Sequence, residues 1–380
     1  MKITALRTHV IAVPLKTVFW MSREPYRTDS EIIVELTTDE GITGYGQIHG
    51  RPMAEIVDIL HSFAELIAGM DALEHLAIWH KLFDLTTSRA RTQMDRDPGQ
   101  PHFGGGKRAQ IMAAIAGVDI ALWDIKGKAV GLPVWKLLGA QNRPVFAYGS
   151  GGYYEEGESP LKVVEEMAGY AELGYRAVKM KCGGLDVAGD LERISKVREA
   201  IGDADLMIDA NAAYTLEQAT EAIRAFADND IFWFEEPLHW YDSVRGLARL
   251  ATRTHVALAS GEGESDRWGI RDLVDLGGIR YMQFDCTRGG GVTEFLRVAS
   301  YAEMHGIMVA PHHDPQIHGH LVLAAPNGFA VETFPNAARD PLWTELYTRR
   351  PEIRAGMLYL GDEPGFGFEI DWKTVDRYRV

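Results

Sequence analysis

The feature that most limits how this chain can fold is a regular alternation of short apolar runs and helix-like segments between residues 145 and 333. Segments with helical spacing, such as Leu216–Ala227 and Leu296–Met304, separate most of the apolar runs. Eight strands that alternate with helices over about 190 residues predict a parallel (β/α) barrel. An open, doubly wound sheet is the second interpretation, but no glycine-rich phosphate fingerprint follows the first strand. The predicted strands are Val145–Tyr148, Ala177–Lys181, Leu206–Asp209, Phe232–Glu235, Val256–Ala259, Tyr281–Asp285, Ile307–Ala310 and Ala330–Thr333.

The residues before this alternation indicate a second kind of structure. Strand-like alternation covers residues 1 to about 13 and 31 to about 49 and includes a hairpin turn at Asp39–Gly44. Helical spacing follows from Ala54 to Ala90 and from Gln110 to Ala129. We therefore predict an α+β domain over residues 1–130, the barrel over 131–340, and a tail over 341–380 that packs back on the first domain.

Two stretches without periodicity are predicted to be loops. Loops this long inside a compact domain are often functional, so we expect them to reach over a site; for the first, an ordinary surface loop is the alternative. The first runs from Leu15 to Ser30 and holds Trp20, Arg23, Tyr26 and Arg27. The second runs from Thr86 to Arg108 and holds His102.

Charge and cysteine content exclude several classes of protein. A formal charge of -15 disfavours a nucleic-acid surface, because phosphate binding needs clustered Lys and Arg. The only cysteines, Cys182 and Cys286, cannot form a disulfide framework and fit a reducing compartment. No apolar run approaches the roughly 20 residues of a membrane span, and the first residues lack the apolar region of a signal peptide. These absences predict a cytoplasmic protein without nucleic-acid or membrane partners.

Polar side chains stand where the predicted strands end, and in a barrel these ends meet at one mouth. Three carboxylates with oxygen donors suit Mg²⁺, which keeps positions open for water and a substrate carboxylate. Removal of a proton beside a carboxylate creates a dianionic enediolate, which a cation and a hydrogen-bond donor stabilise. The pattern therefore predicts metal-assisted proton transfer. The strand-end residues are Lys179, Lys181, Asp209, Asn211, Glu235, Glu236, Glu262, Asp285, His312, His313 and Glu332.

Two acid/base groups stand out in this set. Lys179 and Lys181 are two residues apart on one strand, so both amines project from the same face. Lys181 could be a base if burial, Lys179 and a metal lower its pKa. His312 could be a second base or acid, with Asp285 holding its ring.

Together these motifs resemble the enolase superfamily, mandelate racemase subgroup, with an acid-sugar dehydratase-like pattern. The resemblance covers most of the barrel and extends to the segment that precedes it. The order of the motifs along the chain, with roughly one βα unit between neighbours, is more specific than any single motif. The resemblance is carried by Lys179-Met-Lys181, Ile208-Asp-Ala-Asn211, Phe234-Glu-Glu-Pro237, Ser260-Gly-Glu262, Asp285, Pro311-His312 and Glu332.

The resemblance implies a fold and a role for each matching residue. The fold would be a capping α+β domain, completed by the C-terminal tail, on a (β/α)₇β barrel. Lys181 would be one acid/base, with Lys179 beside it binding the substrate carboxylate. His312, paired with Asp285, would act on the opposite face of the substrate, and a protonated Glu332 would donate a hydrogen bond to the enediolate. The Mg²⁺ ligands would be Asp209, Glu235 and Glu262.

For other residues near the predicted strand ends, we predict roles that are less specific. Glu264 is an alternative metal ligand to Glu262, and His313 is expected to point to the other face of its strand. His318 and His320 are expected in a following loop, with a surface or packing role favoured over substrate contact. Asn211 and Glu236 are expected to orient the ligands. Candidate substrate-binding residues are Asn211, Trp20, Arg23, Arg51 and His313, and Arg23, Arg27, His49 and Arg51 fit a hydroxylated and even diacidic substrate.

The expected reaction is dehydration of an acid sugar to a 2-keto-3-deoxy acid. Lys181 or His312 would take the α-proton, and the His312 imidazolium would protonate the departing hydroxyl. Racemisation or epimerisation of a 2-hydroxy acid is the second interpretation, since the same two groups would serve it. Cycloisomerisation is disfavoured, because those enzymes resemble a Lys-Lys arrangement. A non-catalytic metal-binding barrel is the alternative from another class, although metal binding alone would not need Lys181, His312 and Glu332. Relatives of this kind are often symmetric assemblies, so a homo-oligomer is expected.

Overall fold

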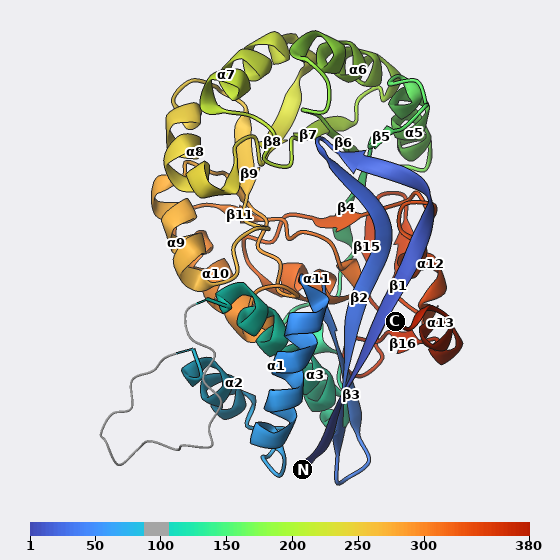
Figure 1. Ribbon diagram of the computed structural model, residues 1–380, viewed down its shortest axis with the longest axis vertical. Coiled ribbons are helices and arrows are strands. Elements are labelled where there is room, and N and C mark those ends of the chain that lie inside the picture. The colour runs from blue at the N-terminus through green and yellow to red at the C-terminus, as the bar shows by residue number, and fades with distance from the viewer. Residues whose placement is uncertain (87–105) are drawn as a thin grey trace.

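The structure, a computed structural model, describes residues 1–86 and 106–380 (Figure 1). An antiparallel sheet and three helices form a cap beside a barrel, whose helices make the outer ring at the top of Figure 1. None of the helices in these residues is long and apolar enough to cross a membrane. The cap contains β1 Ile3–Met21, β2 Glu24–Thr38, β3 Thr43–Ile48, α1 Met53–Ile67, α2 His75–Asp84 and α3 Arg108–Val130.

The first predicted loop is wrong, because most of Leu15–Ser30 belongs to a long hairpin of β1 and β2. The register of the pair shifts between Pro14 and Phe19, and pairing then resumes as Phe19↔Tyr26. This irregularity breaks the period of two that a strand leaves in a sequence. The hairpin tip reaches the barrel mouth, where Ser22 Oγ lies 2.6 Å from the carbonyl oxygen of Cys182.

The cap helices confirm the remaining predictions in part. The span Ala54–Ala90 is not one helix, because α1 ends at Ile67 and Gly69 takes a φ of +76° before α2 begins. Helix α3 covers the predicted Gln110–Ala129 and is buried over most of its length between the cap sheet and the barrel. At Gly46 of β3 a Cβ would lie 1.9 Å from the carbonyl oxygen of Gly117, so only glycine permits this close packing.

The barrel forms as predicted from the alternation of strands and helices. Its strands pair in parallel in the order β4-β6-β7-β8-β9-β10-β11, and β12 closes the ring on β4. The strands are β4 Val145–Gly151, β6 Ala177–Lys181, β7 Asp205–Asp209, β8 Ile231–Glu235, β9 Ala257–Ser260, β10 Tyr281–Met282, β11 Met308–Val309 and β12 Val331–Thr333. The helices are α5 Lys162–Glu172, α6 Val187–Ala200, α7 Leu216–Ala225, α8 Ser243–Ala251, α9 Arg267–Leu276, α10 Gly291–Met304 and α11 Pro315–Ala324.

Side chains inside the barrel decide which residues face its mouth. On β6, Val178 and Met180 pack outward against the helices, whereas Ala177 packs inside with Tyr148 and Trp233. Because strand side chains alternate, Lys179 and Lys181 share the inner face of Ala177. The core of the barrel therefore lies below both lysines and leaves their amines at the mouth.

No full-length helix follows β12 in the barrel ring. Its place is taken by the short α12 Pro341–Glu345, after which the chain runs back toward the cap (Figure 1). The backbone N–H of Val380 donates to the carbonyl of Val10 on β1 at 3.1 Å, and Tyr347 accepts a 2.6 Å bond from Gln47. The tail also touches the barrel, where β15 pairs with β4. Its elements are β13 Tyr347–Arg349, β14 Glu352–Arg354, β15 Met357–Tyr359, β16 Glu369–Ile370 and α13 Trp372–Tyr378.

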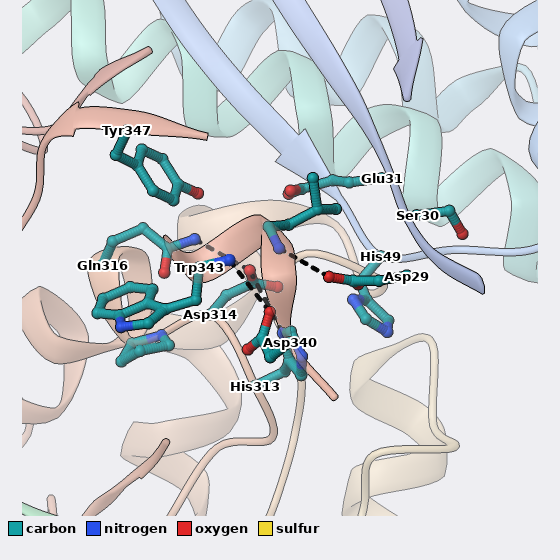
Figure 2. Close-up of a pocket in the computed structure, with 12 residues that line it drawn as sticks. Asp29, Ser30, Glu31, His49, His313, Asp314, Gln316, Asp340, Trp343 and Tyr347 are labelled. Carbon is teal, nitrogen blue, oxygen red and sulfur yellow. Dashed lines mark hydrogen bonds and ion pairs between the residues drawn. The ribbon is translucent and has the colours of Figure 1, made fainter. Parts of the chain in front are cut away.

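Cap, barrel and tail meet around a small cavity of about 20 Å³ (Figure 2). Buried carboxylates of the cap and of the barrel line it: Asp29, Glu31, Asp314 and Asp340. Burial and the neighbouring Asp314 raise the pKa of Glu31 well above its ordinary value, and burial and Asp340 raise that of Asp29 to about 7. One oxygen of Glu31, Oε1, has no hydrogen-bond partner. The junction therefore favours the protonated form of Glu31 and Asp29.

This crowding predicts a pH dependence of stability. A carboxyl group whose folded pKa is raised holds its proton in the folded state at pH values where the unfolded chain has lost it, so stability falls as pH rises above the unfolded value. Glu31→Gln should therefore reduce the loss of unfolding free energy between pH 5 and pH 8, by up to about 1.4 kcal/mol per pH unit. Urea unfolding at several pH values measures this slope. Glu65→Gln, at an exposed position of α1, is the control and should leave it unchanged; an equal slope in Glu31→Gln would contradict the prediction.

Candidate active site

A cavity of about 410 Å³ opens at the barrel mouth, beneath the β1–β2 hairpin. Barrel residues form its floor, and residues 24–28 of the hairpin form part of its wall. Among its lining residues are the predicted Lys181, Asn211, Glu262, His312 and Glu332. Because these come from five different strand ends or the loops behind them, the parallel barrel brings together residues that are far apart in the sequence.

Two lysines and two carboxylates interlock at the ends of β6, β7 and β8. The parallel register sets Lys181 beside Asp209 and Asp209 beside Glu235. Lys181 Nζ lies 2.5 Å from Asp209 Oδ2, and Lys179 Nζ lies 2.5 Å from Glu235 Oε1. All four side chains are buried. Charges this deep are stable only when paired, so each lysine compensates a carboxylate on a neighbouring strand.

The expected lowering of the Lys181 pKa depended in part on a bound metal, and the protein groups alone have the opposite effect. Burial does lower the pKa of the amine, but the attraction of Asp209 outweighs it, and the net pKa is raised above the ordinary value. Lys179 has a raised pKa for a similar reason, because Glu235 and Glu332 together outweigh its burial. Both amines are therefore protonated while these carboxylates face them.

The protein groups around Glu332 favour its ionised form, whereas the resemblance implies a protonated one. Glu332 Oε1 lies 2.7 Å from Lys179 Nζ, and Glu332 Oε2 accepts a hydrogen bond from the backbone N–H of His313 at 3.0 Å. Burial raises the pKa of this carboxyl group, but Lys179 and His312 outweigh it and hold the net pKa well below the ordinary value. Glu332 is therefore an acceptor that anchors Lys179.

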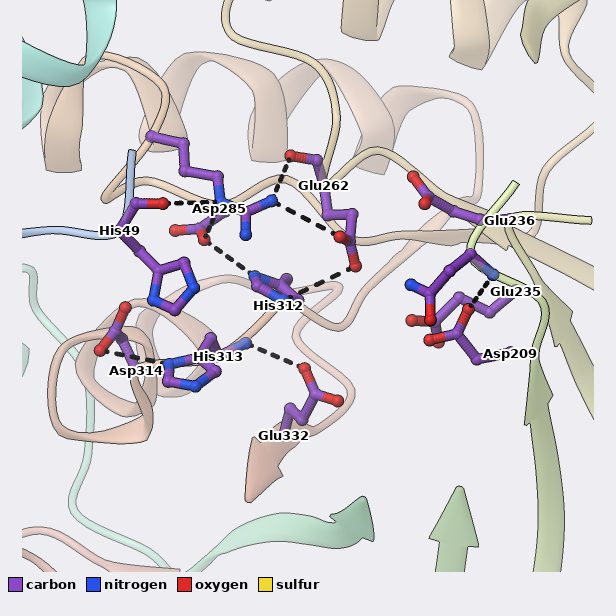
Figure 3. A network of polar contacts seen from close by, with 12 residues as sticks. His49, Asp209, Glu235, Glu236, Glu262, Asp285, His312, His313, Asp314 and Glu332 are labelled. Carbon is purple, nitrogen blue, oxygen red and sulfur yellow. Dashed lines mark hydrogen bonds and ion pairs between the residues drawn. The ribbon is translucent and has the colours of Figure 1, made fainter. Parts of the chain in front are cut away.

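His312 belongs to a second polar network on the other side of the cavity (Figure 3). Its Nδ1 lies 2.9 Å from Asp285 Oδ2, and its Nε2 lies 3.7 Å from Glu262 Oε2. Arg288 joins the same two carboxylates, at 3.4 Å from Asp285 and 3.5 Å from Glu262. Burial raises the pKa of Asp285, but its bond to His312 and the neighbouring charges lower the net value. An ionised Asp285 therefore holds the His312 ring through Nδ1, so that Nε2 faces Glu262.

The two candidate glutamates after β9 point to different surfaces. Glu262 lines the central cavity and contacts His312 and Arg288. Glu264 lines neighbouring grooves instead and is absent from the lining of the central cavity. Burial and Asp266 raise the pKa of Glu264. The geometry therefore favours Glu262 over Glu264 as the partner of Asp209 and Glu235.

The histidines after β11 lie beyond the strand, because β11 ends at Val309. His313 takes a φ of +56°, and its ring lines the small junction cavity behind the site. His318 and His320 are on helix α11, not in a loop, and both are fully buried. His318 Nε2 accepts a hydrogen bond from the backbone N–H of Cys286, and His320 Nδ1 accepts one from Trp135. Their packing role is as expected, whereas the predicted substrate contact of His313 has no support from the cavity lining.

The predicted substrate-binding residues divide into two groups. Arg51 and Asn211 line the central cavity, and the backbone N–H of Asn211 donates to Asp209 Oδ1 at 2.8 Å. Trp20 and Arg23 do not line it. Trp20 pairs through its backbone with Pro25 and Tyr154 in the hairpin sheet. Most of the second predicted loop, Thr86–Arg108 with His102, lies outside the described residues.

Outside the hairpin, sequence reasoning missed five residues that line the cavity: Tyr153, Trp240, Arg288, Phe334 and Arg339. Arg288 carried a usable signal, because it lies three residues after Asp285 at a strand end. Tyr153 follows the Gly151-Gly152 end of the first strand and could have been found in the same way. Arg339 follows no predicted strand end closely, and only the tertiary fold brings it here.

The carboxylate cluster, which consists of Asp209, Glu235, Glu236 and Glu262, has the oxygen ligands that a hard divalent cation needs. Glu235 Oε2, Glu236 Oε1 and Asn211 Oδ1 are buried oxygens without a hydrogen-bond partner. Burial and the carboxylates of Asp209, Glu332 and Glu262 raise the pKa of Glu235 although Lys179 opposes them. Unpartnered oxygens among crowded carboxylates indicate a shortage of positive charge, which Mg²⁺ would supply through oxygen ligands.

Beside this cluster, three side chains have ligating atoms that all lie within 4.8 Å of one another: His49, His313 and Asp314. This is the single such triad in the described part of the chain. The Arg339 guanidinium lies 3.4 Å from His313 Nε2 and places a positive charge against this group. The carboxylate cluster differs from this triad in holding unpartnered buried carboxylate oxygens, on Glu235 and Glu236, which suit a hard cation.

Two family profiles match this architecture. "Mandelate racemase / muconate lactonizing enzyme, N-terminal domain" matches residues 3–139, and "Enolase C-terminal domain-like" matches residues 162–374. The chain belongs to the enolase superfamily, in the mandelate racemase/muconate lactonizing enzyme group. Membership confirms both the resemblance and the fold of a capping domain on a TIM-type barrel.

Relatives in this superfamily include two kinds of acid-sugar enzyme. Arabinonate dehydratase of Saccharolobus solfataricus is 31% identical over 92% of this chain and 90% of its own length. D-galactarolactone cycloisomerase of Agrobacterium fabrum is 32% identical over 100% of this chain and 99% of its own. A solved structure of a mandelate racemase/muconate lactonizing enzyme from a marine actinobacterium, in complex with magnesium, is 33% identical in sequence to this chain. The match covers 100% of this chain and 99% of the other chain, with a TM-score of 0.84. This chain is therefore an enzyme of the superfamily. The cycloisomerase is as similar in sequence to this chain as the dehydratase is, so cycloisomerisation stays among the candidate reactions.

Proposed function

We propose that this enzyme uses Mg²⁺ to dehydrate an acid sugar to a 2-keto-3-deoxy acid. The observation that carries the proposal is that Lys181 and His312 line one cavity, Lys181 beside Asp209 and His312 beside Glu262. Asp209, Glu235 and Glu262 would hold the cation. When bound, magnesium supplies positive charge that offsets the charge developing on the substrate carboxylate.

The chain's own residues account for the proton transfers. Lys181, in its neutral amine form, or His312 removes the proton next to the substrate carboxylate, and Lys179 stabilises the resulting negative charge. The imidazolium of His312, held by Asp285, gives its proton to the β-hydroxyl as the carbon–oxygen bond breaks, so that water leaves. The enol product then tautomerises to the keto acid. Glu332 holds Lys179 in position through their 2.7 Å contact.

The same two acid/base groups also support racemisation of a 2-hydroxy acid. Two cycloisomerase relatives, one named for a lactone and one for an anhydro sugar acid, support a reaction that opens a ring. In each case the first step is removal of the proton beside a carboxylate. The reactions differ in their second step, which is loss of water, return of the proton to the other face, or loss of an internal oxygen leaving group. Product identity therefore separates them.

Incubation with Mg²⁺ and a panel of acid sugars in D₂O tests the proposal. We expect α-deuterium by NMR and a 2-keto acid product with at least one acid sugar. A change in optical rotation without a keto product would favour racemisation, and consumption of a lactone by ring opening would favour cycloisomerisation. No α-exchange with any acid sugar, and identical results for Lys181→Ala and His312→Asn, would contradict an enzymatic role and leave a metal-binding barrel.

A further inference from the structure

Arg339 is a buried cation at the edge of the active-site cavity. Its side chain lines the cavity but is only 5% exposed, and it lies just before α12. No carboxylate oxygen of the described residues lies within 4.0 Å of its guanidinium. Arginine is normally paired when it is buried this deeply, because an isolated buried charge is costly. Arg339 therefore has unused capacity for an anion.

Aromatic rings hold the guanidinium in a fixed position. Its central carbon lies 3.9 Å from the Phe334 ring centroid, 4.6 Å from that of Tyr26 and 5.2 Å from that of Tyr153. Cation–π contacts stabilise the charge while leaving its N–H groups available. Nε donates to Tyr153 Oη at 3.0 Å, Nη1 lies 3.4 Å from His313 Nε2, and in the described part of the chain Nη2 donates no hydrogen bond.

The nearest acids are already engaged elsewhere. Asp29 accepts hydrogen bonds from Tyr26 Oη at 3.0 Å and from the backbone N–H of Leu342 at 3.0 Å. Asp340 caps α12 by accepting from the backbone N–H of Trp343 at 3.1 Å. Both face the small junction cavity of Figure 2, whereas Arg339 lines the central cavity. Both acids raise the pKa of Arg339 through their charge, but neither forms an ion pair with its guanidinium within 4.0 Å.

Tyr153 connects Arg339 to the reacting end of the cavity. Lys181 Nζ lies 5.3 Å from the centroid of the same tyrosine ring whose hydroxyl accepts from Arg339. A substrate bound with one carboxylate at Lys179 and the carboxylate cluster would extend past Lys181 toward this tyrosine. A cavity of about 410 Å³ has room for a six-carbon sugar acid with a carboxylate at each end. Arg27 and Arg51 also line this cavity and add positive charge.

We propose that Arg339 and Tyr153 form an anion subsite for a second carboxylate, so that the substrate is a sugar diacid (an aldaric acid) and not a monocarboxylic sugar acid. This inference rests on the proposed function for the first carboxylate and its α-proton. The guanidinium provides planar N–H donors that match a carboxylate, and Tyr153 adds a hydroxyl. Arg339 is a substrate-binding residue in this scheme and takes no part in proton transfer.

Matched pairs of sugar acids test this proposal. Galactarate is compared with galactonate, and glucarate with gluconate, by α-deuterium exchange with Mg²⁺ and by ligand-induced thermal shift. A hydrogen bond to a charged group is worth about 1.5–3 kcal/mol, so wild type should prefer the diacid by about 10- to 150-fold in kcat/KM. Arg339→Gln should lose most of that preference through KM, and Arg339→Lys should recover part of it. Arg143→Gln, at an exposed position before β4 that does not line the cavity, should keep it.

The diacid-to-monoacid ratio within each variant is independent of the fraction of protein that folds. Equal or better turnover of the monoacid by wild type would overturn the diacid assignment while leaving the proposed function in place. A diacid preference that survives in Arg339→Gln would overturn the role of Arg339. Absence of exchange with every sugar acid would contradict the proposed function itself, whereas a selective thermal shift with the diacids, lost in Arg339→Gln, would still support the anion subsite.

Discussion

Lys181→Ala should lower the rate of α-proton exchange by about 10²- to 10⁴-fold, the usual contribution of a positioned acid/base group. Lys181 lines the cavity beside the carboxylate cluster, and its amine is 2.5 Å from Asp209. Alanine leaves nothing on that side of the substrate to accept or return a proton. Single-turnover exchange in D₂O, followed by NMR with saturating Mg²⁺, measures the chemical step directly.

Two controls separate lost chemistry from lost structure. Lys196→Ala removes an exposed lysine of α6 that pairs with Glu199 at 2.9 Å and should leave exchange unchanged. Stabilisation of Lys181→Ala by Mg²⁺ in a thermal melt should persist, because removal of the amine frees an oxygen of Asp209. Exchange at the wild-type rate in Lys181→Ala would show that His312 alone handles the α-proton. Loss of Mg²⁺ stabilisation would instead make the variant a metal-site defect.

Much of the site could be predicted because a parallel barrel converts strand order into spatial proximity. Asp209 and Glu235 are 26 positions apart in the sequence, yet their strands pair in register at the ends. Locating the ends of apolar runs was therefore enough to identify them. The same reasoning found His312 and Asp285, although both lie beyond the ends of very short strands.

What could not be predicted depends on distances between side chains and on irregular backbone. The pKa of Lys181 depends on which charge is closest, and a sequence does not show that Asp209 outweighs burial. The hairpin was missed because its register shifts between Pro14 and Phe19. Arg339 was missed because it reaches the cavity from the loop before α12, where no strand end marks it.

Glu235→Gln should abolish most Mg²⁺-dependent activity. Glu235 is fully buried, one oxygen pairs with Lys179 at 2.5 Å, and the other has no partner. Glutamine replaces a charged ligand by a neutral amide and leaves Lys179 with less compensation. Changes beside metal ligands already cost about 10- to 100-fold in affinity, so loss of a ligand should weaken Mg²⁺ binding by more than about 100-fold. Calorimetric titration with Mg²⁺ measures the affinity, and the increase in melting temperature with Mg²⁺ gives a second readout.

Glu264→Gln is the matched control because it makes the same chemical change two residues after Glu262, in a side chain that lines neighbouring grooves. It should keep wild-type Mg²⁺ affinity and exchange, while Glu262→Gln should resemble Glu235→Gln. A loss of Mg²⁺ binding in Glu264→Gln that is absent from Glu262→Gln would assign the third ligand to Glu264. Mg²⁺ affinity unchanged in both Glu235→Gln and Glu262→Gln would place the cation outside the carboxylate cluster, and the two-sided arrangement of Lys181 and His312 would then need another source of positive charge.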